Sequence, residues 1–283
     1  MVLECGQRIG RYRLVERIGA GRESEVWRAT DDPARRDVAI KVYAQCVDRV
    51  SVRLEHPNLL PSLVDGEHEA RSYAVMPYIA SGSLRAHLDG RAWPLSRAMS
   101  ILEPLAAVLD ALHQQGIVHG NLKPSNVLLT TDGCPLLCDI QVRPSASPRI
   151  VTDPHDLGFS APGYVAPEHA TGGPTTPATD RYSLGVLAYV LLTGRPPFVG
   201  NSALAILLDQ IVKEAPSPRT LNPRVSEPAE RAVLALLAKD PARRCRSGAE
   251  FVAALREAAG ACQREGFSRF LTNAATSNRP MPV

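Results

Sequence analysis

The chain has 283 residues, a hydrophobic share of 45% and a formal net charge of +3 at pH 7. This length and apolar content are sufficient for two compact domains or for one bilobal unit with a substantial core. The positive charge comes from scattered arginines rather than from a basic block, so we expect a solvated mixed-charge surface and no nucleic-acid partner.

The sequence carries no strong signal for a membrane or for secretion. Its longest apolar stretch, Leu184 to Thr193, is too short to span a bilayer and is followed by Gly194, which indicates a helix end. The amino terminus carries Glu4 and lacks the extended apolar core of a secretory signal. We therefore expect a cytoplasmic location and no membrane segment.

Six cysteines are spread along the chain without a Cys-x-x-Cys pair. This distribution predicts reduced thiols packed as small apolar groups, and neither a zinc site nor a disulfide framework. Cys134 and Cys138 are close in sequence, but they bracket residues 135–137, which are typical of a strand.

In chain order, the first expected elements are short strands. Apolar alternation at residues 12–15, 25–29 and 38–42 is interrupted by glycines and by an Asp-Asp-Pro turn. This pattern predicts a small antiparallel sheet between Tyr12 and Tyr78.

Beyond Ser83 the apolar residues take helical spacing. The clearest case predicts a helix that buries its leucines and has Ser96 at its N-cap. These leucines are Leu102, Leu105, Leu109 and Leu112. Two later helices are expected at residues 202–212 and 247–259, the second with Ser247 and Glu250 in a capping-box pattern.

The most informative motif is His119-Gly120-Asn121-Leu122-Lys123-Pro124-Ser125-Asn126. It resembles the catalytic loop of protein kinases, whose pattern is His-Arg-Asp followed by Leu-Lys-Pro-x-Asn. Gly120 replaces the arginine, and Asn121 replaces the aspartate that steers the substrate hydroxyl. The resemblance implies catalytic positions at Lys123 and, with a degenerate base, at Asn121.

Upstream segments resemble the nucleotide-binding parts of the same family. Residues 19–26 are similar to the glycine-rich loop, although a simple turn between strands would also favour glycine. Residues 38–41 are similar to the strand whose lysine neutralises nucleotide phosphates; an exposed sheet-edge lysine is the alternative. Residues 75–79 resemble the hinge, where Pro77 keeps its carbonyl and Ile79 its N–H for an adenine. The resemblance implies ATP contacts from Gly19, Gly21, Ser24, Val26, Ala39, Lys41, Met76, Pro77, Ile79 and Leu128.

Asn126 and Asp139 stand at the positions that hold magnesium in the family. Asp139 is followed by Ile140 and Gln141, where Phe-Gly is the usual continuation. Ile140 keeps an apolar side chain, but Gln141 lacks the backbone freedom of glycine. The resemblance therefore implies ATP and Mg²⁺ as cofactors.

Other positions depart from the family pattern. Between Lys41 and His56 there is room for only a short helix, about 15 Å long over residues 45–54, and its usual glutamate is replaced near Val47 and Asp48. Ala161 replaces the threonine that normally bonds the catalytic aspartate and lysine. Gly120 removes the arginine that reads a phosphate on the activation segment. Four hydroxyls there are expected to be ordinary polar loop residues, with modification by another kinase as the alternative. These are Ser145, Ser147, Thr152 and Ser160.

Architectural residues of the family are kept. Glu168 and Arg244 match an ion pair that ties the activation segment to later helices, and Asp180 matches a helix acid that bonds the catalytic-loop backbone. The resemblance covers about residues 8 to 262 and is strongest to bacterial eukaryotic-like Ser/Thr kinases. It implies an α+β bilobal fold, with an antiparallel sheet lobe and one short helix at 8–78, a mainly helical lobe at 79–262, and a tail at 263–283 outside the core.

Two functions follow from the resemblance. The first is a pseudokinase that binds ATP with Mg²⁺ and regulates a partner protein, such as an active kinase, by its shape. The second is a weak or unconventional Ser/Thr protein kinase, in which Asp139 or the substrate itself takes the role that Asn121 has lost.

Overall fold

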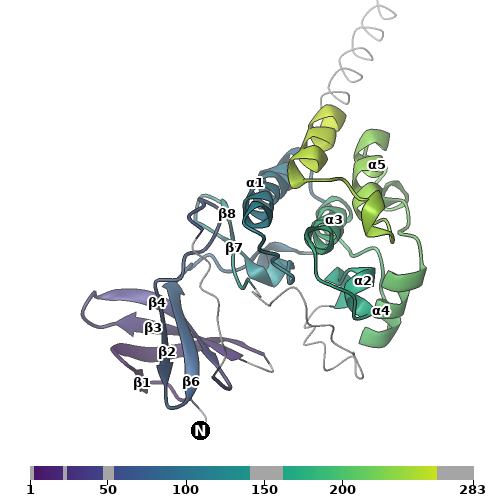
Figure 1. The fold of residues 1–283 in the computed structure, drawn as a ribbon. Coiled ribbons are helices and arrows are strands. Elements are labelled where there is room, and N and C mark those ends of the chain that lie inside the picture. The colour runs from purple at the N-terminus through teal and green to yellow at the C-terminus, as the bar shows by residue number, and fades with distance from the viewer. Residues whose placement is uncertain (1–2, 22–23, 47–53, 141–161, 260–283) are drawn as a thin grey trace, which may run out of the picture.

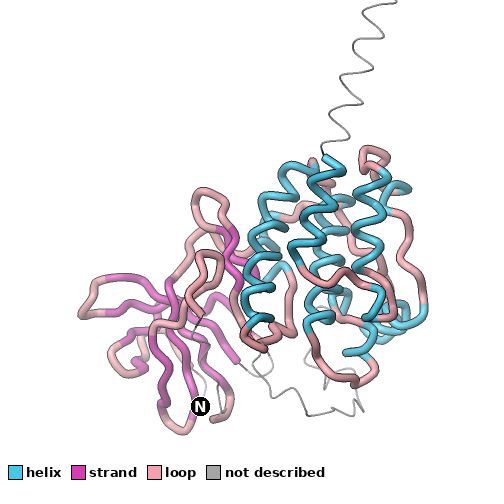
Figure 2. Tube along the Cα trace, turned by 45° about the horizontal axis from the view of Figure 1, so that its top comes forward, coloured by secondary structure: helices cyan, strands magenta, loops and turns pink. Residues whose placement is uncertain are grey.

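The computed structural model describes residues 3–21, 24–46, 54–140 and 162–259. A twisted sheet forms one lobe and a group of helices forms the other, so the predicted α+β bilobal fold is confirmed (Figure 1). The view in Figure 2 separates the strands from the helices in the same way. The expected helix near residues 45–54 and the expected tail at 263–283 lie largely or wholly outside the described residues.

The sheet lobe is a six-stranded antiparallel sheet in the order β1-β2-β3-β4-β6-β5. Its strands are β1 (Arg8–Ile9), β2 (Tyr12–Ala20), β3 (Ser24–Asp31), β4 (Arg36–Tyr43), β5 (Val64–His68) and β6 (Arg71–Pro77). Alternate side chains of the central strands enter a small core that contains Tyr12, Leu14, Trp27, Ile40 and Val75. The predicted strands at 12–15, 25–29 and 38–42 all lie in this sheet, because their period of two buries one face.

The helical lobe is built around α3 (Pro177–Thr193), whose side chains are almost all buried. Two helices, α1 (Leu95–Gln114) and α5 (Glu227–Leu236), pack against it. As the apolar stretch predicted, α3 ends at Gly194, whose φ of 82° is in the left-handed region that glycine adopts without strain. Gly185 allows close approach to α5, because a Cβ there would lie 2.6 Å from the Cβ of Leu236.

The leucines of α1 are buried as predicted, but its N-cap is not Ser96. The helix begins at Leu95 and its N-cap is Pro94, with no side-chain capping bond. Proline sets φ near −65° and has no N–H to satisfy, so Pro94 can precede the first helical residue, two positions before the predicted cap Ser96.

Residues 248–259 form a further helix beside α1. The carboxylate of Asp110 on α1 accepts hydrogen bonds from the backbone N–H groups of Gly248 and Ala249, at 2.8 and 2.9 Å. Ser247 Oγ accepts from the N–H of Glu250 at 3.1 Å, whereas the Glu250 carboxylate accepts from Arg246. One of the two hydrogen bonds of the predicted capping box is therefore present, the one to Ser247 Oγ. Asp110 accepts the N–H groups of the first two helical residues.

The remaining helices flank this core. The predicted helix at 202–212 is α4 (Ala203–Val212), capped by Ser202, and it packs on the short α2 (Pro167–Ala170) and on η3 (Pro162–Tyr164). Short 3-10 turns complete the lobe: η1 (Leu84–His87), η2 (Pro124–Asn126), η4 (Pro218–Thr220) and η5 (Pro241–Arg243).

A two-stranded ribbon joins the lobes, formed by β7 (Val127–Leu129) and β8 (Pro135–Leu137). Figure 1 shows it between the large sheet and α1. The backbone of Leu137 pairs with Asn58 and Leu60, which lie on the chain between β4 and β5. Cys134 and Cys138 flank β8 as predicted, and every cysteine within the described ranges is a free thiol.

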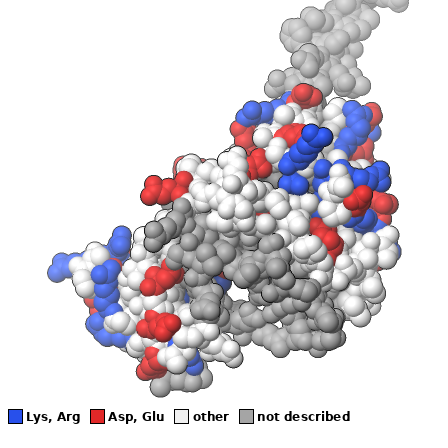
Figure 3. All heavy atoms as spheres, viewed as in Figure 1, with Lys and Arg blue, Asp and Glu red and all other residues white. Residues whose placement is uncertain are grey.

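Charges of both signs are distributed over both lobes on the face shown in Figure 3. Many of the sheet-lobe arginines are paired with nearby carboxylates, as in Arg8 with Asp32 and Arg28 with Asp37. In the parts of the chain that the structure describes, we find no helix with the length and apolar content required to cross a membrane.

Candidate functional site

The loop from His119 to Asn126 is held in place by Asp180 of α3. This carboxylate accepts hydrogen bonds from the backbone N–H groups of His119 and Gly120, both at 2.8 Å, and bonds His113 Nε2 at 2.8 Å. Asp180 is almost fully buried, so these bonds replace the water that it would otherwise require. The sequence prediction for Asp180 is confirmed.

The His119 ring connects this loop to the segment that contains Asp139. Its Nε2 bonds the carbonyl of Cys138 at 3.0 Å, and its Nδ1 accepts the backbone N–H of Asn121 at 3.1 Å. One nitrogen must donate and the other must accept, which is the pattern of a neutral imidazole. Complete burial agrees with this assignment, since it lowers the pKa of His119.

Asp139 is the centre of the cluster. Its Oδ1 forms a short ion pair with Lys41 Nζ of β4, and its Oδ2 accepts a long hydrogen bond of 3.3 Å from Asn121 Nδ2. Burial acts to raise the pKa of the Asp139 carboxyl, but the charge and hydrogen bond of Lys41 outweigh it, so the pKa lies below its ordinary value. Asp139 also has a φ of 66°, a left-handed conformation that is strained for a residue other than glycine.

The pKa values of Lys41 and Lys123 are shifted in opposite directions by these surroundings. Burial acts to lower the pKa of Lys41, but Asp139 outweighs it and the pKa is raised. The pKa of Lys123 is lowered, first by burial and also by the positive charge of Lys41. Both lysines therefore act electrostatically on the Asp139 carboxylate, although they come from separate lobes.

Asn126 completes the cluster from η2. Its Nδ2 donates to the backbone carbonyl of Asn121 at 2.8 Å, and its own carbonyl accepts the N–H of Cys138 at 2.9 Å. The fold therefore brings together the predicted catalytic pair, Asn121 and Lys123, and the predicted metal pair, Asn126 and Asp139.

A divalent cation does not fit these side chains as they lie. Magnesium binds through oxygen ligands in a nearly octahedral shell. Asp139 is the carboxylate of this cluster, and each of its oxygens already faces a nitrogen donor. The amide nitrogen of Asn126 is also engaged, so Asn126 could offer only its neutral side-chain oxygen. No group of three or more His, Cys, Asp or Glu side chains suited to a metal occurs among the described residues.

The residues predicted to contact nucleotide are spread over the sheet and the ribbon. Gly19, Val26 and Lys41 pair across β2, β3 and β4 in one row of the sheet. Ala39 is two residues from Lys41 and pairs with Met76 of β6, so both share the face of Lys41. These directly opposed residues place the predicted lysine and the predicted hinge side chain on one side of the lobe.

The other predicted contacts lie in the β2–β3 hairpin, at or just after the end of β6, and in β7. Gly21 donates its N–H to the carbonyl of Ser24 at 2.8 Å and closes the β2–β3 hairpin. This hairpin role agrees with the turn interpretation and leaves the phosphate interpretation open. Pro77 ends β6, Ile79 follows it, and Leu128 lies half-buried in β7.

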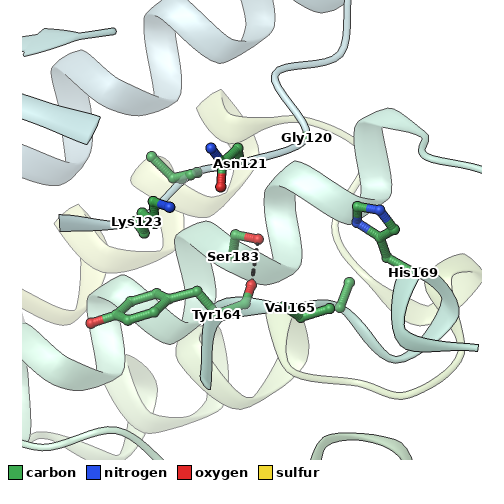
Figure 4. A pocket seen from close by; sticks show the side chains of 9 residues that line it. Gly120, Asn121, Lys123, Tyr164, Val165, His169 and Ser183 are labelled. Atoms are coloured by element: carbon green, nitrogen blue, oxygen red, sulfur yellow. Dashed lines mark hydrogen bonds between the residues drawn. The ribbon is translucent and has the colours of Figure 1, made fainter. Parts of the chain in front are cut away.

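A hollow lies on the helical side of Asn121 (Figure 4). Ser183 Oγ of α3 donates to the carbonyl of Tyr164 at 2.8 Å and joins two of its walls. The hollow is lined by Gly120, Asn121, Leu122, Lys123, Tyr164, Val165, Ala166, His169 and Ser183. Sequence reasoning did not select Tyr164, His169 or Ser183 as site residues, although each lies within three residues of one that it named: Ala161, Glu168 or Asp180.

Two further predictions for this region concern the Glu168–Arg244 pair and Gly120. The Glu168–Arg244 pair is confirmed, with hydrogen bonds of 2.7 and 2.8 Å. Gly120 has a φ of 70°, so the residue that replaces the usual arginine adopts a glycine conformation. Val47, Asp48, Gln141 and Ala161 lie outside the described residues, as do the hydroxyls at 145, 147, 152 and 160.

Comparison with known proteins gives a consistent result. Residues 12–254 match the protein kinase domain. The chain is 36% identical over 256 residues to the DNA damage-responsive serine/threonine-protein kinase RqkA of Deinococcus radiodurans, covering 85% of this chain and 38% of that protein. It is 32% identical over 269 residues to the serine/threonine-protein kinase PrkC of Bacillus subtilis, covering 89% and 41%.

A third relative is the serine/threonine-protein kinase PknA of Mycobacterium tuberculosis, 33% identical over 268 residues, with 87% of this chain and 61% of that protein covered. The chain therefore spans between about two fifths and three fifths of the length of these relatives.

Proposed function

Because this chain belongs to the protein kinase family, we propose that it is a nucleotide-binding kinase-like domain with impaired phosphotransfer, which regulates a partner protein by its shape. The observation that carries this proposal is the amide of Asn121 at the position of the family's catalytic carboxylate, where it faces Asp139. A carboxylate accepts a proton from a substrate hydroxyl, whereas an amide does not.

The expected loss is large. A positioned general base contributes roughly 10²- to 10⁴-fold to a rate, and phosphoryl transfer depends mainly on positioning and charge stabilisation. His119 does not replace the missing base, because its Nδ1 accepts from Asn121 and its Nε2 donates to Cys138. Asp139 is the described carboxylate beside Asn121, and its two oxygens already face Lys41 and Asn121.

Nucleotide binding is supported by what the cluster keeps. Lys41 and Lys123 lie near Asp139 and supply positive charge for phosphates, and the face of β4 that carries Lys41 also carries Ala39 and Met76. ATP is the nucleotide we propose, since protein kinases use ATP with a divalent cation. Asn126 and Asp139 are the positions predicted to hold such a cation, but their side chains do not fit it as they lie.

The regulatory role is supported by the intact scaffold. The Glu168–Arg244 pair and the Asp180 contacts keep the helical lobe in order while the base position is changed. A partner protein, such as an active kinase, would then recognise the folded surface. A cytoplasmic location is part of this proposal.

The proposal is tested by the melting temperature of the full chain with millimolar ATP. A ligand that binds only the native state at tenfold excess over its Kd stabilises it by about 1.4 kcal/mol, which raises the melting temperature by roughly 3–6 °C. We expect this rise in the wild type and in Lys213→Ala, an exposed control, but not in Lys41→Ala. No rise at any Mg²⁺ concentration contradicts nucleotide binding.

A weak or unconventional Ser/Thr protein kinase is the second candidate, and the relatives favour it, since each one compared here is a serine/threonine-protein kinase. Transfer of labelled phosphate to the chain itself or to a generic protein substrate distinguishes the two. Incorporation that Lys41→Ala abolishes and Lys213→Ala preserves would establish the kinase and overturn the impaired phosphotransfer.

A further inference from the structure

We infer that this site holds a free nucleotide polyphosphate, with no requirement for a divalent cation. The inference rests on the proposed nucleotide binding and concerns how the phosphates are neutralised. It follows from the two nitrogen donors, Lys41 and Asn121, that already occupy the oxygens of Asp139.

The first step is the competition for Asp139. A cation that binds this carboxylate must displace or repel Lys41, whose ammonium forms a short ion pair with Oδ1. It must also approach Oδ2 against the amide hydrogens of Asn121. An aspartate at position 121 would present oxygens here and attract the cation, whereas the Asn121 amide presents the hydrogens of its Nδ2.

The second step is the net charge of the charged side chains around Asp139, which we call the site floor. Two ammonium groups, of Lys41 and Lys123, and one carboxylate, of Asp139, give this group a formal charge of +1. His119 is neutral in its hydrogen-bonded form and adds nothing. With an aspartate at position 121 the same sum would be zero.

The third step is the charge of the ligand. ATP without magnesium carries more negative charge than its magnesium complex, and a net positive floor favours the more negative form. The side chains are also partly withdrawn from water, with 16% of Lys41 and 26% of Asp139 exposed, so solvent screens these charges less than at an open surface. An ammonium has three N–H donors, so Lys41 can contact phosphate while it keeps its ion pair with Asp139, and Asn121 keeps its bond to the same carboxylate.

The test measures ATP binding to the full chain by titration calorimetry, in EDTA and in excess Mg²⁺ at matched ionic strength. We expect the two Kd values to agree within about threefold, or the EDTA value to be the lower. Binding that appears only with Mg²⁺ overturns this inference and leaves nucleotide binding intact. Absence of binding in both conditions refutes the proposed function, and this inference with it.

Asn121→Asp sharpens the test, because it removes the donor and takes the floor charge from +1 to zero. We expect this change to weaken ATP binding in EDTA by about tenfold or more, and Mg²⁺ to recover much of the loss. Asn201→Asp adds the same charge at an exposed loop position and should leave both Kd values unchanged. Equal effects of the two substitutions would contradict the role of Asn121.

A protein that no longer folds with an aspartate at position 121 would still be tested by Asn121→Ser, which removes the amide donor without adding charge. We expect a smaller loss in EDTA, of about threefold, with the melting temperature of the free protein as the check on folding. Unchanged affinity in both conditions would show that the Asn121 amide does not shape the site.

Discussion

Arg244 reaches across 76 residues of sequence to hold Glu168 through two hydrogen bonds, of 2.7 and 2.8 Å. The Arg244 side chain is fully buried and also donates to the backbone carbonyls of Ala178, Ala238 and Lys239. A charged group in this position is stable only because each part of the guanidinium has a partner. The pair joins α2 to the turn before the helix at residues 248–259.

Removal of this guanidinium should therefore be costly. We expect Arg244→Ala to lower the free energy of unfolding by about 3–5 kcal/mol, because Glu168 is left as an unpaired and largely buried charge. Urea denaturation measures the change. The neighbouring Arg243 is exposed, so Arg243→Ala should stay within about 0.5 kcal/mol of the wild type. Similar losses in the two variants would show that the ion pair is not the cause.

Acid should destabilise the protein through His119. Burial holds the pKa of this imidazole below its ordinary value, so the unfolded chain takes up a proton first. Stability is then fully present above the unfolded pKa of about 6.5 and decreases as the pH falls below it. His119 contributes at most about 1.4 kcal/mol per pH unit to this slope.

The slope is measured by urea unfolding between pH 8 and about pH 5. His119→Phe should reduce the slope by up to about 1.4 kcal/mol per pH unit, which corresponds to one proton. It should also lower the stability at every pH, because it removes two hydrogen bonds. His87 is exposed, so His87→Phe should retain the wild-type slope. An unchanged slope in His119→Phe would contradict the neutral, buried imidazole.

Gly185 should not tolerate a methyl group, although alanine is favoured over glycine within a helix by about 1 kcal/mol. A Cβ at this position would lie 2.6 Å from Leu236 Cβ and 3.2 Å from Leu237 Cδ2. Overpacking of this kind costs roughly 1–3 kcal/mol, so we expect Gly185→Ala to be destabilising in thermal unfolding. Gly163→Ala is the control, since its Cβ would have no neighbour closer than 3.9 Å. A rise in stability with Gly185→Ala would contradict the close packing of α3 on α5.

Asp110 and Glu103 both lie on α1 and both contact the last helix, but they should matter unequally. Asp110→Ala removes the acceptor for two N–H groups at the start of that helix and should cost about 0.5–2 kcal/mol. Glu103→Ala breaks an ion pair with Arg256 in which both side chains are largely exposed, and should cost less than about 0.5 kcal/mol. Urea unfolding of the two variants under the same conditions decides the order, and a larger loss for Glu103→Ala would refute the cap.

Much of the fold could be predicted from local patterns. The strands of the sheet and the leucines of α1 follow directly from periods of two and about 3.6, because these periods bury one face of each element. Ser96 was wrong as a cap because its neighbour Pro94 opens the helix by fixing its own backbone. That outcome depends on how the loop enters the helix, which capping preferences alone do not describe.

The sequence by itself determined the family pattern, the change at Asn121 and the residues that could bind nucleotide. Only the tertiary structure decided what that amide does: it faces Asp139, which is 18 residues away, while Lys41 reaches the same carboxylate from 98 residues away. These contacts depend on how the two lobes and β8 pack together, and no local pattern encodes such distances. The charge balance of the site, and with it the expected independence from metal, is therefore a property of the packed molecule.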